Sequence, residues 1–293
     1  MFNQPPDRDE NSLQESPPPR KRHPLEEGPP PPPRPPAPEQ PRRQITLRIP
    51  IVQPSLTLAL IAINLLVFLA GFISPEIGET LFVRGASRAF EVLRGGEYYR
   101  LFTAMFLHAG LAHIFFNMYA LYILGTQLEP VFGHVRFGLI YLFGGLAGSV
   151  LSVVMGLADL RGAASVGASG AVFAIFGAEM IYLYRHREIM GERGRAQFRS
   201  LLWLLGLNFM VGIATSFGGS RVRIDNWAHL GGLLGGLALT WVIGPRYHVT
   251  QDPQNPDRFF ADDANPVENK YWFVSVFLIG MVGLLAVASL LAR

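Results

Sequence analysis

The chain has 293 residues, of which 49% are hydrophobic and only 16% are charged, with a formal net charge of +3 and no cysteine. So small a net charge argues against a nucleic-acid partner, which would need a strongly basic surface. The lack of cysteine excludes disulfides, thiol catalysis and cysteine-bound metal. Because the apolar residues are concentrated in long runs, the composition indicates a membrane protein.

The first 50 residues contain 16 of the 23 prolines, including an unbroken run at 29–33. This segment has too few apolar residues to form a core, so we expect residues 1–50 to be a disordered cytoplasmic tail. A solvated tail is the simpler interpretation, and a polyproline ligand for a partner domain is the alternative.

Seven charge-free segments follow, each long enough, or nearly so, to cross a hydrocarbon core of about 30 Å as a helix. They are Ile49–Pro75, Leu101–Leu128, Phe137–Ala158, Gly162–Ala178, Ser200–Ser220, Asn226–Pro245 and Tyr271–Ala292. The sequence therefore predicts an all-α polytopic membrane protein. Residues 51–245 would form a six-helix domain, and residues 246–293 a cytoplasmic linker and a seventh transmembrane helix.

Basic residues set the predicted orientation. With the tail inside, 17 Lys and Arg lie on the inner side and 8 on the outer side, and the five arginines of the loop 185–199 decide the sign. The amino terminus is then cytoplasmic and the carboxyl terminus outside. Only two of the 25 basic residues are lysine, which indicates a GC-rich genome and favours a bacterial inner (plasma) membrane. Residues 74–100 are predicted to lie on the outer leaflet.

Polar side chains inside predicted spans are costly and therefore mark candidate functional sites. The second, fourth and sixth spans all run from outside to inside, with predicted helix starts near Ala109, Ala168 and Asn226. His113 and Asn117 lie on one face early in the second span, Ser169 lies in the first turn of the fourth, and His229 in the first turn of the sixth. At about 1.5 Å per residue, all four lie within roughly the outer third of the bilayer.

Each of these residues also has a structural explanation. A serine in a membrane helix commonly bonds back to a carbonyl, a histidine pairs with backbone, and an asparagine holds helices together. Their common depth on three helices favours chemistry instead. Ser169 stands in Gly167-Ala168-Ser169-Gly170, at a helix start that favours negative charge. His229 is the candidate general base that makes its hydroxyl nucleophilic.

Small residues predict close contact between the fourth and sixth spans. Gly232 and Gly236 lie on the side of His229, and Gly170 begins the facing helix. Packing alone explains these glycines equally well, but it does not explain a serine and a histidine at the top of the seam. Phe173, one turn along the fourth span, is predicted to stack on the histidine ring.

Acyl transfer creates an oxyanion, and the sequence offers candidate donors for it. They are the side chains of His113 and Asn117 and the backbone N–H of Ser169. His108, nearer the water boundary, is interpreted as structural.

Two acidic residues near these helices are candidates for a part in the chemistry. Asp225 precedes His229 by four residues and is an alternative triad acid, but an aspartate at a helix start is ordinary and a carboxylate is not required. Glu179 lies too deep to take part and is expected to pack or to snorkel.

At these residues the sequence resembles the rhomboid family of intramembrane serine proteases. The matching motifs, in chain order, are Tyr99-Arg100 (the family usually has Trp-Arg), His113-x-x-x-Asn117, Glu129 followed by Gly133, Gly167-x-Ser169-Gly170, and Ala228-His229-x-x-Gly232-x-x-x-Gly236. The serine motif alone is weak, whereas the ordered set over residues 55–245 is specific. The added helix at the carboxyl end resembles members with six helices plus one.

The resemblance implies a rhomboid-like six-helix bundle plus one C-terminal transmembrane helix, with residues 51–245 as the catalytic domain. It implies a serine endopeptidase that cleaves transmembrane segments of membrane proteins near the outer face through a Ser169–His229 dyad, without metal, ATP or another cofactor. His113 and Asn117 would stabilise the oxyanion. Supporting positions are Gly167, Gly170, Phe173, Gly232, Gly236 and Arg100. The fifth span and the loop Ala214–Asp225 would gate substrate access.

Two rival interpretations remain from the sequence. A catalytically inactive rhomboid-like protein would bind or escort membrane clients, but such relatives usually lack the serine or the histidine, and both are present. A transporter would place its polar groups near the bilayer centre, whereas these residues cluster toward one face.

Overall fold

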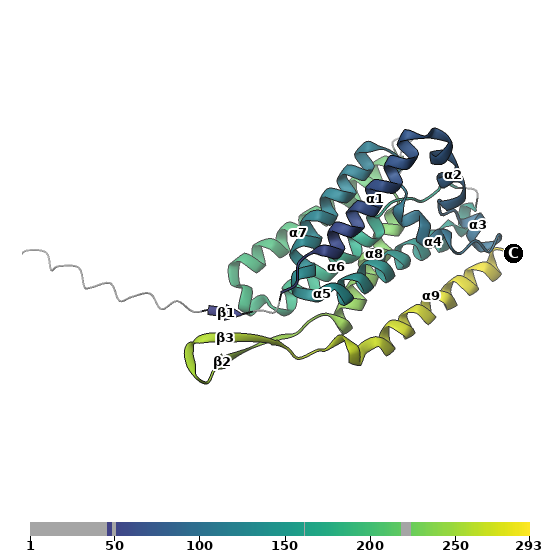
Figure 1. Ribbon diagram of the computed structural model, residues 1–293. Helices are drawn as coiled ribbons and strands as arrows, with labels where there is room; N and C mark the ends of the chain where they lie inside the picture. The colour runs from purple at the N-terminus through teal and green to yellow at the C-terminus, as the bar shows by residue number, and fades with distance from the viewer. Residues whose placement is uncertain (1–45, 49–50, 161, 218–223) are drawn as a thin grey trace, which may run out of the picture. The chain divides into compact units, whose positions relative to one another are not determined.

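The computed structural model describes residues 46–48, 51–160, 162–217 and 224–293, within one unit that runs from Ile45 to Arg293 (Figure 1). The predicted tail, except 46–48, and positions 218–223 of the predicted gating loop lie outside the described residues. The helices are α1 (Ser55–Ile73), α2 (Pro75–Gly85), α3 (Ala89–Leu93), α4 (Arg100–Thr103), α5 (Leu111–Met155), α6 (Ser169–Arg185), α7 (Arg187–Phe217), α8 (Asn226–Ile243) and α9 (Tyr271–Leu291). The strands are β1 (Thr46–Arg48), β2 (Tyr247–Asp252) and β3 (Asn255–Asp263).

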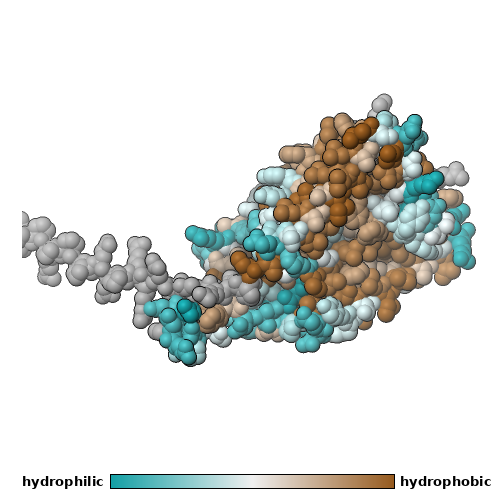
Figure 2. Space-filling view, in the orientation of Figure 1, coloured by the Kyte–Doolittle hydropathy of each residue, from teal (hydrophilic) through white to brown (hydrophobic). Residues whose placement is uncertain are grey.

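These helices make the protein an all-α polytopic membrane protein, as the sequence predicted. Four helical stretches of the described chain are long and apolar enough to cross a membrane: Ser55–Ile73, Leu111–Ala158, Arg187–Ala214 and Val267–Leu291. The shorter α6 and α8 have 17 and 18 residues. Each of the seven predicted segments overlaps a helix within its described residues, although residues 162–168 precede α6 and seven separate crossings stay a prediction. Hydrophobic side chains cover the middle of the visible face, and hydrophilic ones gather toward β2–β3 and α3 (Figure 2).

The starts of the three helices that carry the candidate site agree with the prediction to within two residues. Helix α5 begins at Leu111, α6 at Ser169 and α8 at Asn226. Helix α5 is 45 residues long and contains a joint at Gly133, whose φ of +77° is open mainly to glycine. The joint divides α5 into two legs, 111–132 and 134–155, which correspond to the second and third predicted spans.

A β-hairpin occupies the segment that the sequence analysis expected to be only a linker. Strands β2 and β3 pair antiparallel, and β1 adds to β3 in parallel, in the order β1-β3-β2. The hairpin is held to the α5 joint and the end of α6. The Tyr247 hydroxyl donates to the Val131 carbonyl at 2.5 Å, and the Tyr247 N–H donates to Nε2 of His186 at 3.2 Å.

An ion pair completes this attachment. The Arg136 guanidinium donates to the Asp263 carboxylate and to the Asn265 carbonyl, both at 2.5 Å. Burial alone would raise the pKa of Asp263, but the backbone N–H groups of Arg246 and Asn265, together with Arg136, lower it. The carboxylate therefore stays ionised at neutral pH and holds the end of β3 against α5.

The carboxyl end of α9 lies at the opposite end of the helices from the hairpin. The Arg94 guanidinium donates to the Ala292 carbonyl at 2.5 Å, and the Tyr98 and Ser289 hydroxyls lie 3.2 Å apart. Segment 74–100 and the carboxyl terminus are thus together, in agreement with the predicted topology. Which end faces the outside of the cell stays a prediction.

Candidate active site

Ser169 is the first residue of α6, directly after a turn that requires glycine. Gly167 has a φ of +124°, and a Cβ at this position would lie 2.7 Å from Nε2 of His113. Its N–H donates to the Ala104 carbonyl at 2.9 Å. Both backbone conformation and space therefore exclude a side chain at 167, which explains the first glycine of the Gly-x-Ser-Gly motif.

His229 lies in the first turn of α8 and is only 6% exposed. Its ring stacks on Phe173, with ring centroids 4.1 Å apart and planes inclined by 12°, so this predicted contact is confirmed. Within the described part of the chain, the buried Nδ1 has no hydrogen-bond partner. The ring is therefore oriented by aromatic packing and not by a carboxylate.

The seam between α6 and α8 is a contact of backbone against backbone. A methyl group on Gly232 would overlap the carbonyl oxygen of Gly170, and one on Gly236 would overlap that of Ala174. The predicted close approach of these two helices is confirmed. It places the first turn of α6, which carries Ser169, beside the first turn of α8.

The second leg of α5 packs against both α6 and α8 at this seam. The sequence did not predict this contact. A Cβ on Gly148 would lie 2.6 Å from the Ala228 carbonyl oxygen and 3.3 Å from Cα of Gly170. A Cβ on Gly144 would overlap the side chain of Ala174. The small-xxx-small spacing of Gly144 and Gly148 is the sequence signal that could have predicted this contact.

No hydrogen bond joins Ser169 to His229 within the described residues. Catalytic hydrogen bonds are often long without substrate and tighten in the reacting complex. The position of the two residues therefore rests on the glycine seam and on the stack with Phe173, which fix the helices and the ring separately.

Asp225, the alternative triad acid, is used for capping. One carboxylate oxygen accepts the N–H of Ala228 at 2.9 Å, and the other accepts the Ser152 hydroxyl at 2.5 Å. The aspartate thus closes the start of α8 and ties it to α5. Neither of these bonds is directed to the His229 ring.

The two candidate oxyanion donors lie beside the turn that precedes Ser169. Ala109 donates its N–H to Nδ1 of His113 at 3.4 Å, which leaves the proton of a neutral ring on Nε2, the nitrogen next to Gly167. The Asn117 side-chain amide donates to the His113 carbonyl at 3.0 Å, and its nitrogen is 3.8 Å from the Cβ position of Gly167. Both side chains are therefore directed at the same turn.

His108 belongs to this neighbourhood more closely than the sequence suggested. Its ring meets the His113 ring edge-on, with centroids 5.1 Å apart at 65°. Both of its nitrogens are buried. The ring supports His113 by packing, which fits the structural role predicted for it.

Arg100 holds the outer segment together. Its guanidinium donates to Glu97 at 2.7 Å and to the carbonyls of Val83 and Ala86 at 2.7 and 3.0 Å. Hydrogen bonds from the Tyr99 hydroxyl and then from Arg100 lower the pKa of Glu97. The aromatic-Arg motif therefore braces the turn between α2 and α3.

That turn also contacts the loop that leads to Ser169. Ser87 and Ser165 exchange both backbone hydrogen bonds, at 3.1 and 2.8 Å. Ser165 lies four residues before Ser169, so the bridge connects the Arg100 segment to the loop that enters α6. We infer that Arg100 acts on the site by position and does not contact the reacting atoms.

Within the described chain, no group of three or more His, Asp or Glu side chains is arranged to hold a metal ion. The site instead combines a hydroxyl at a helix start, a buried imidazole on the neighbouring helix and two N–H donors on a third. This set matches the needs of acyl transfer, namely a nucleophile, a base and an oxyanion site.

Comparison with known proteins agrees with this arrangement. The family model for the Rhomboid domain matches residues 95–246. The chain belongs to the rhomboid family. It is 35% identical over 215 residues to RHOMBOID-like protein 1 of Arabidopsis thaliana, covering 70% of this chain and 52% of the relative. It is 38% identical over 172 residues to RHOMBOID-like protein 6, mitochondrial, of the same plant, covering 59% and 52%.

A bacterial relative carries a protease name. The chain is 35% identical over 196 residues to Rhomboid protease GluP of Bacillus subtilis (strain 168), covering 66% of this chain and 35% of the relative. The chain spans about half the length of the plant relatives. The match places both the serine and histidine helices inside the rhomboid domain, whereas α1 and α9 lie outside it.

Proposed function

We propose that this rhomboid is an intramembrane serine endopeptidase that cleaves transmembrane segments of membrane proteins near the outer membrane face. Ser169 is the nucleophile and His229 the general base. The observation that carries the proposal is the backbone contact of Gly170 with Gly232, which brings the two first turns together while Phe173 orients the imidazole.

The reaction follows from these positions. The Ser169 hydroxyl attacks the peptide carbonyl as His229 takes its proton, and the oxyanion accepts hydrogen bonds from Nε2–H of His113, the Asn117 amide and the Ser169 N–H. His229 then gives its proton to the leaving amine, and water, activated by the same imidazole, releases the acyl group. Such preorganised donors are worth about 10²–10³-fold each in rate.

The alternative is an inactive rhomboid that binds membrane clients, and one experiment separates the two. A fluorophosphonate probe is added to purified wild type, Ser169→Ala and Ser200→Ala. Ser200 is an exposed serine of α7 whose hydroxyl bonds to the Ala196 carbonyl of its own helix. We expect label on wild type and on Ser200→Ala, and none on Ser169→Ala. An unlabelled wild type that still binds a transmembrane client would favour the inactive alternative.

We further propose that the site end faces the outside of a bacterial inner membrane. The argument is the arginine excess of residues 185–199, which end α6 opposite Ser169 and begin helix α7 in place of the predicted loop. Single cysteines at Ala163 and Arg193 are introduced into the cysteine-free chain. An impermeant thiol reagent on intact cells should label position 163 and not 193. The reverse pattern would invert the orientation.

A further inference from the structure

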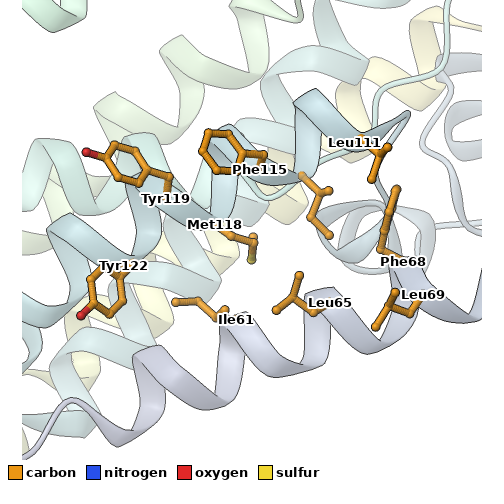
Figure 3. A pocket seen from close by; sticks show the side chains of 10 residues that line it. Ile61, Leu65, Phe68, Leu69, Leu111, Phe115, Met118, Tyr119 and Tyr122 are labelled. Carbon is orange, nitrogen blue, oxygen red and sulfur yellow. The ribbon is translucent and has the colours of Figure 1, made fainter. Parts of the chain in front are cut away.

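An apolar groove runs between α1 and the first leg of α5, the leg that also carries His113 and Asn117. Its volume is about 500 Å³. Ile61 and Phe68 of α1 and the buried Ile114 and Met118 of α5 form its floor. Figure 3 shows side chains from the two helices facing each other across it, with the hydroxyls of Tyr119 and Tyr122 directed away.

The groove opens toward the bilayer. Leu65, Leu111, Phe115 and Tyr119 on its rim are between 41% and 64% exposed. Both walls belong to stretches long and apolar enough to span a membrane. None of its lining residues is charged. A charge-free groove between two membrane-spanning stretches excludes water. Its wall atoms need hydrocarbon partners to keep their dispersion contacts.

The size of the groove decides which hydrocarbon fits. A 20-residue transmembrane helix, about 10 Å wide and 30 Å long, occupies roughly 2,400 Å³, almost five times the groove volume of about 500 Å³. A substrate helix or a helix of a second copy can therefore lie only against the rim, by one face, and cannot pass between the walls. A single extended chain is much thinner and fits between the walls. The rings of Phe115 and Tyr119 already stack at 6.1 Å and 11°, so this part of the rim is ordered without a ligand.

We propose that the groove binds one acyl chain of a membrane phospholipid. The bound chain separates α1 from α5 and holds the floor residues Ile114 and Met118, which directly follow His113 and Asn117 in the sequence. The lipid thus supports the leg of α5 that carries the oxyanion donors. Binding itself depends on the groove and not on peptide cleavage, so it is tested without an activity assay.

The first test maps contacts on the unaltered protein. The full chain is placed in phosphatidylcholine vesicles in which one acyl chain carries a diazirine, and adducts are located by mass spectrometry after illumination. We expect adducts at Met118 and Leu65 to exceed those at Ile279 and Val282, which lie 70% and 64% exposed on α9. Equal labelling of the two sets would overturn the proposal, as would displacement of the groove adducts by an added transmembrane peptide.

The second test fills the groove with a matched pair of substitutions. Ile61→Phe adds a ring at the floor, and Ile279→Phe makes the same change on the open face of α9. Native mass spectrometry in mild detergent should find a retained phospholipid on wild type and on Ile279→Phe, and should find it lost from Ile61→Phe. Retention by all three proteins, or by none, contradicts the proposal. If Ile61→Phe does not fold, Leu65→Phe at the rim, paired with Leu284→Phe on α9, replaces it.

Discussion

Two helices pack beside Phe173 and differ in how they are held. Helix α8 buries ten of its 18 residues and meets α6 and α5 through glycines. Between positions 187 and 214 of α7, three residues are buried: Gly194, Leu201 and Gly212. Helix α7 reaches the site through Phe209, whose ring meets Phe173 edge-on at 5.9 Å.

The difference separates two requirements of the proposed chemistry. The serine and the histidine must keep a fixed geometry, and helices in backbone contact cannot shift without a clash. A substrate segment must reach them through the lipid, and a helix with few buried contacts opens at a lower free energy. We therefore expect α8 to be intolerant of added volume and α7 to be tolerant of it.

Removal of the proposed nucleophile has the largest expected effect and sets the reference against which the smaller losses are compared. Ser169→Ala should lower cleavage of a model transmembrane substrate by at least about 10³-fold. Thermal stability should stay at the wild-type value, because the Ser169 hydroxyl makes no described hydrogen bond. Residual cleavage above about 1% of wild type in liposomes would exclude Ser169 as the nucleophile.

The comparison between α8 and α7 is tested by one glycine substitution on each of these two helices. Gly232→Val forces a side chain into the Gly170 carbonyl, and we expect about 10²-fold loss of cleavage from a displacement near 1 Å, with about 1–3 kcal/mol of destabilisation. Gly206→Val on α7 has open space within 4 Å and should leave both values near wild type. Cleavage rate and melting temperature are measured for both. A wild-type rate in Gly232→Val would remove the geometric support for the dyad.

Substitution of the proposed oxyanion donors on α5 should give a similar or smaller loss of cleavage. Asn117→Ala should cost about 10²-fold in rate, or roughly 2.7 kcal/mol of transition-state stabilisation. The double variant with His113→Ala should lose less than the product of the two single losses if both donors serve one anion. Single-turnover rates give the required values. Unchanged turnover in both single variants would assign these residues to packing alone.

The sequence predicted the parts of this site that depend on local pattern. The starts of α6 and α8, the contact of Gly232 with α6 and the stack of Phe173 on the histidine all follow from helical spacing. It did not predict contacts between distant segments, such as Ser152 with Asp225, the bridge of Ser87 to Ser165, or the role of Gly148. No periodicity reports which helices become neighbours, so these needed the three-dimensional fold.

The β-hairpin was missed for a different reason. Its strands carry Pro256 and four aspartates, residue types that favour turns over strands. What stabilises them is attachment to α5 through the pairs Arg136–Asp263 and Tyr247–Val131, and the two residues of each pair lie over 100 positions apart in the chain. Local propensity gives no access to such contacts.

Loss of the side-chain hydrogen bond between α6 and α7 has the smallest expected effect on activity. The Gln197 side-chain amide donates to Glu179 at 2.5 Å and to Gln127 at 3.1 Å. Glu179 is only 3% exposed, so it is packed and does not snorkel, and its second oxygen has no hydrogen-bond partner among the described residues. Gln197 therefore anchors the basic end of α7 to two other helices.

Gln197→Leu removes the donor from this buried carboxylate, which should cost about 1–3 kcal/mol of stability. The loss should be local, because α7 has few other buried contacts, so amide hydrogen exchange should quicken in residues 192–200 and not in α8. The cleavage rate should change only a few-fold, since the seam that holds Ser169 and His229 is untouched. Asn208→Leu is the matched control, because among the described residues the Asn208 amide bonds only to the Leu204 carbonyl of its own helix. If exchange quickens equally in α7 and α8, the two helices open as one unit. The proposed distinction between a rigidly packed α8 and a separately held α7 is then wrong.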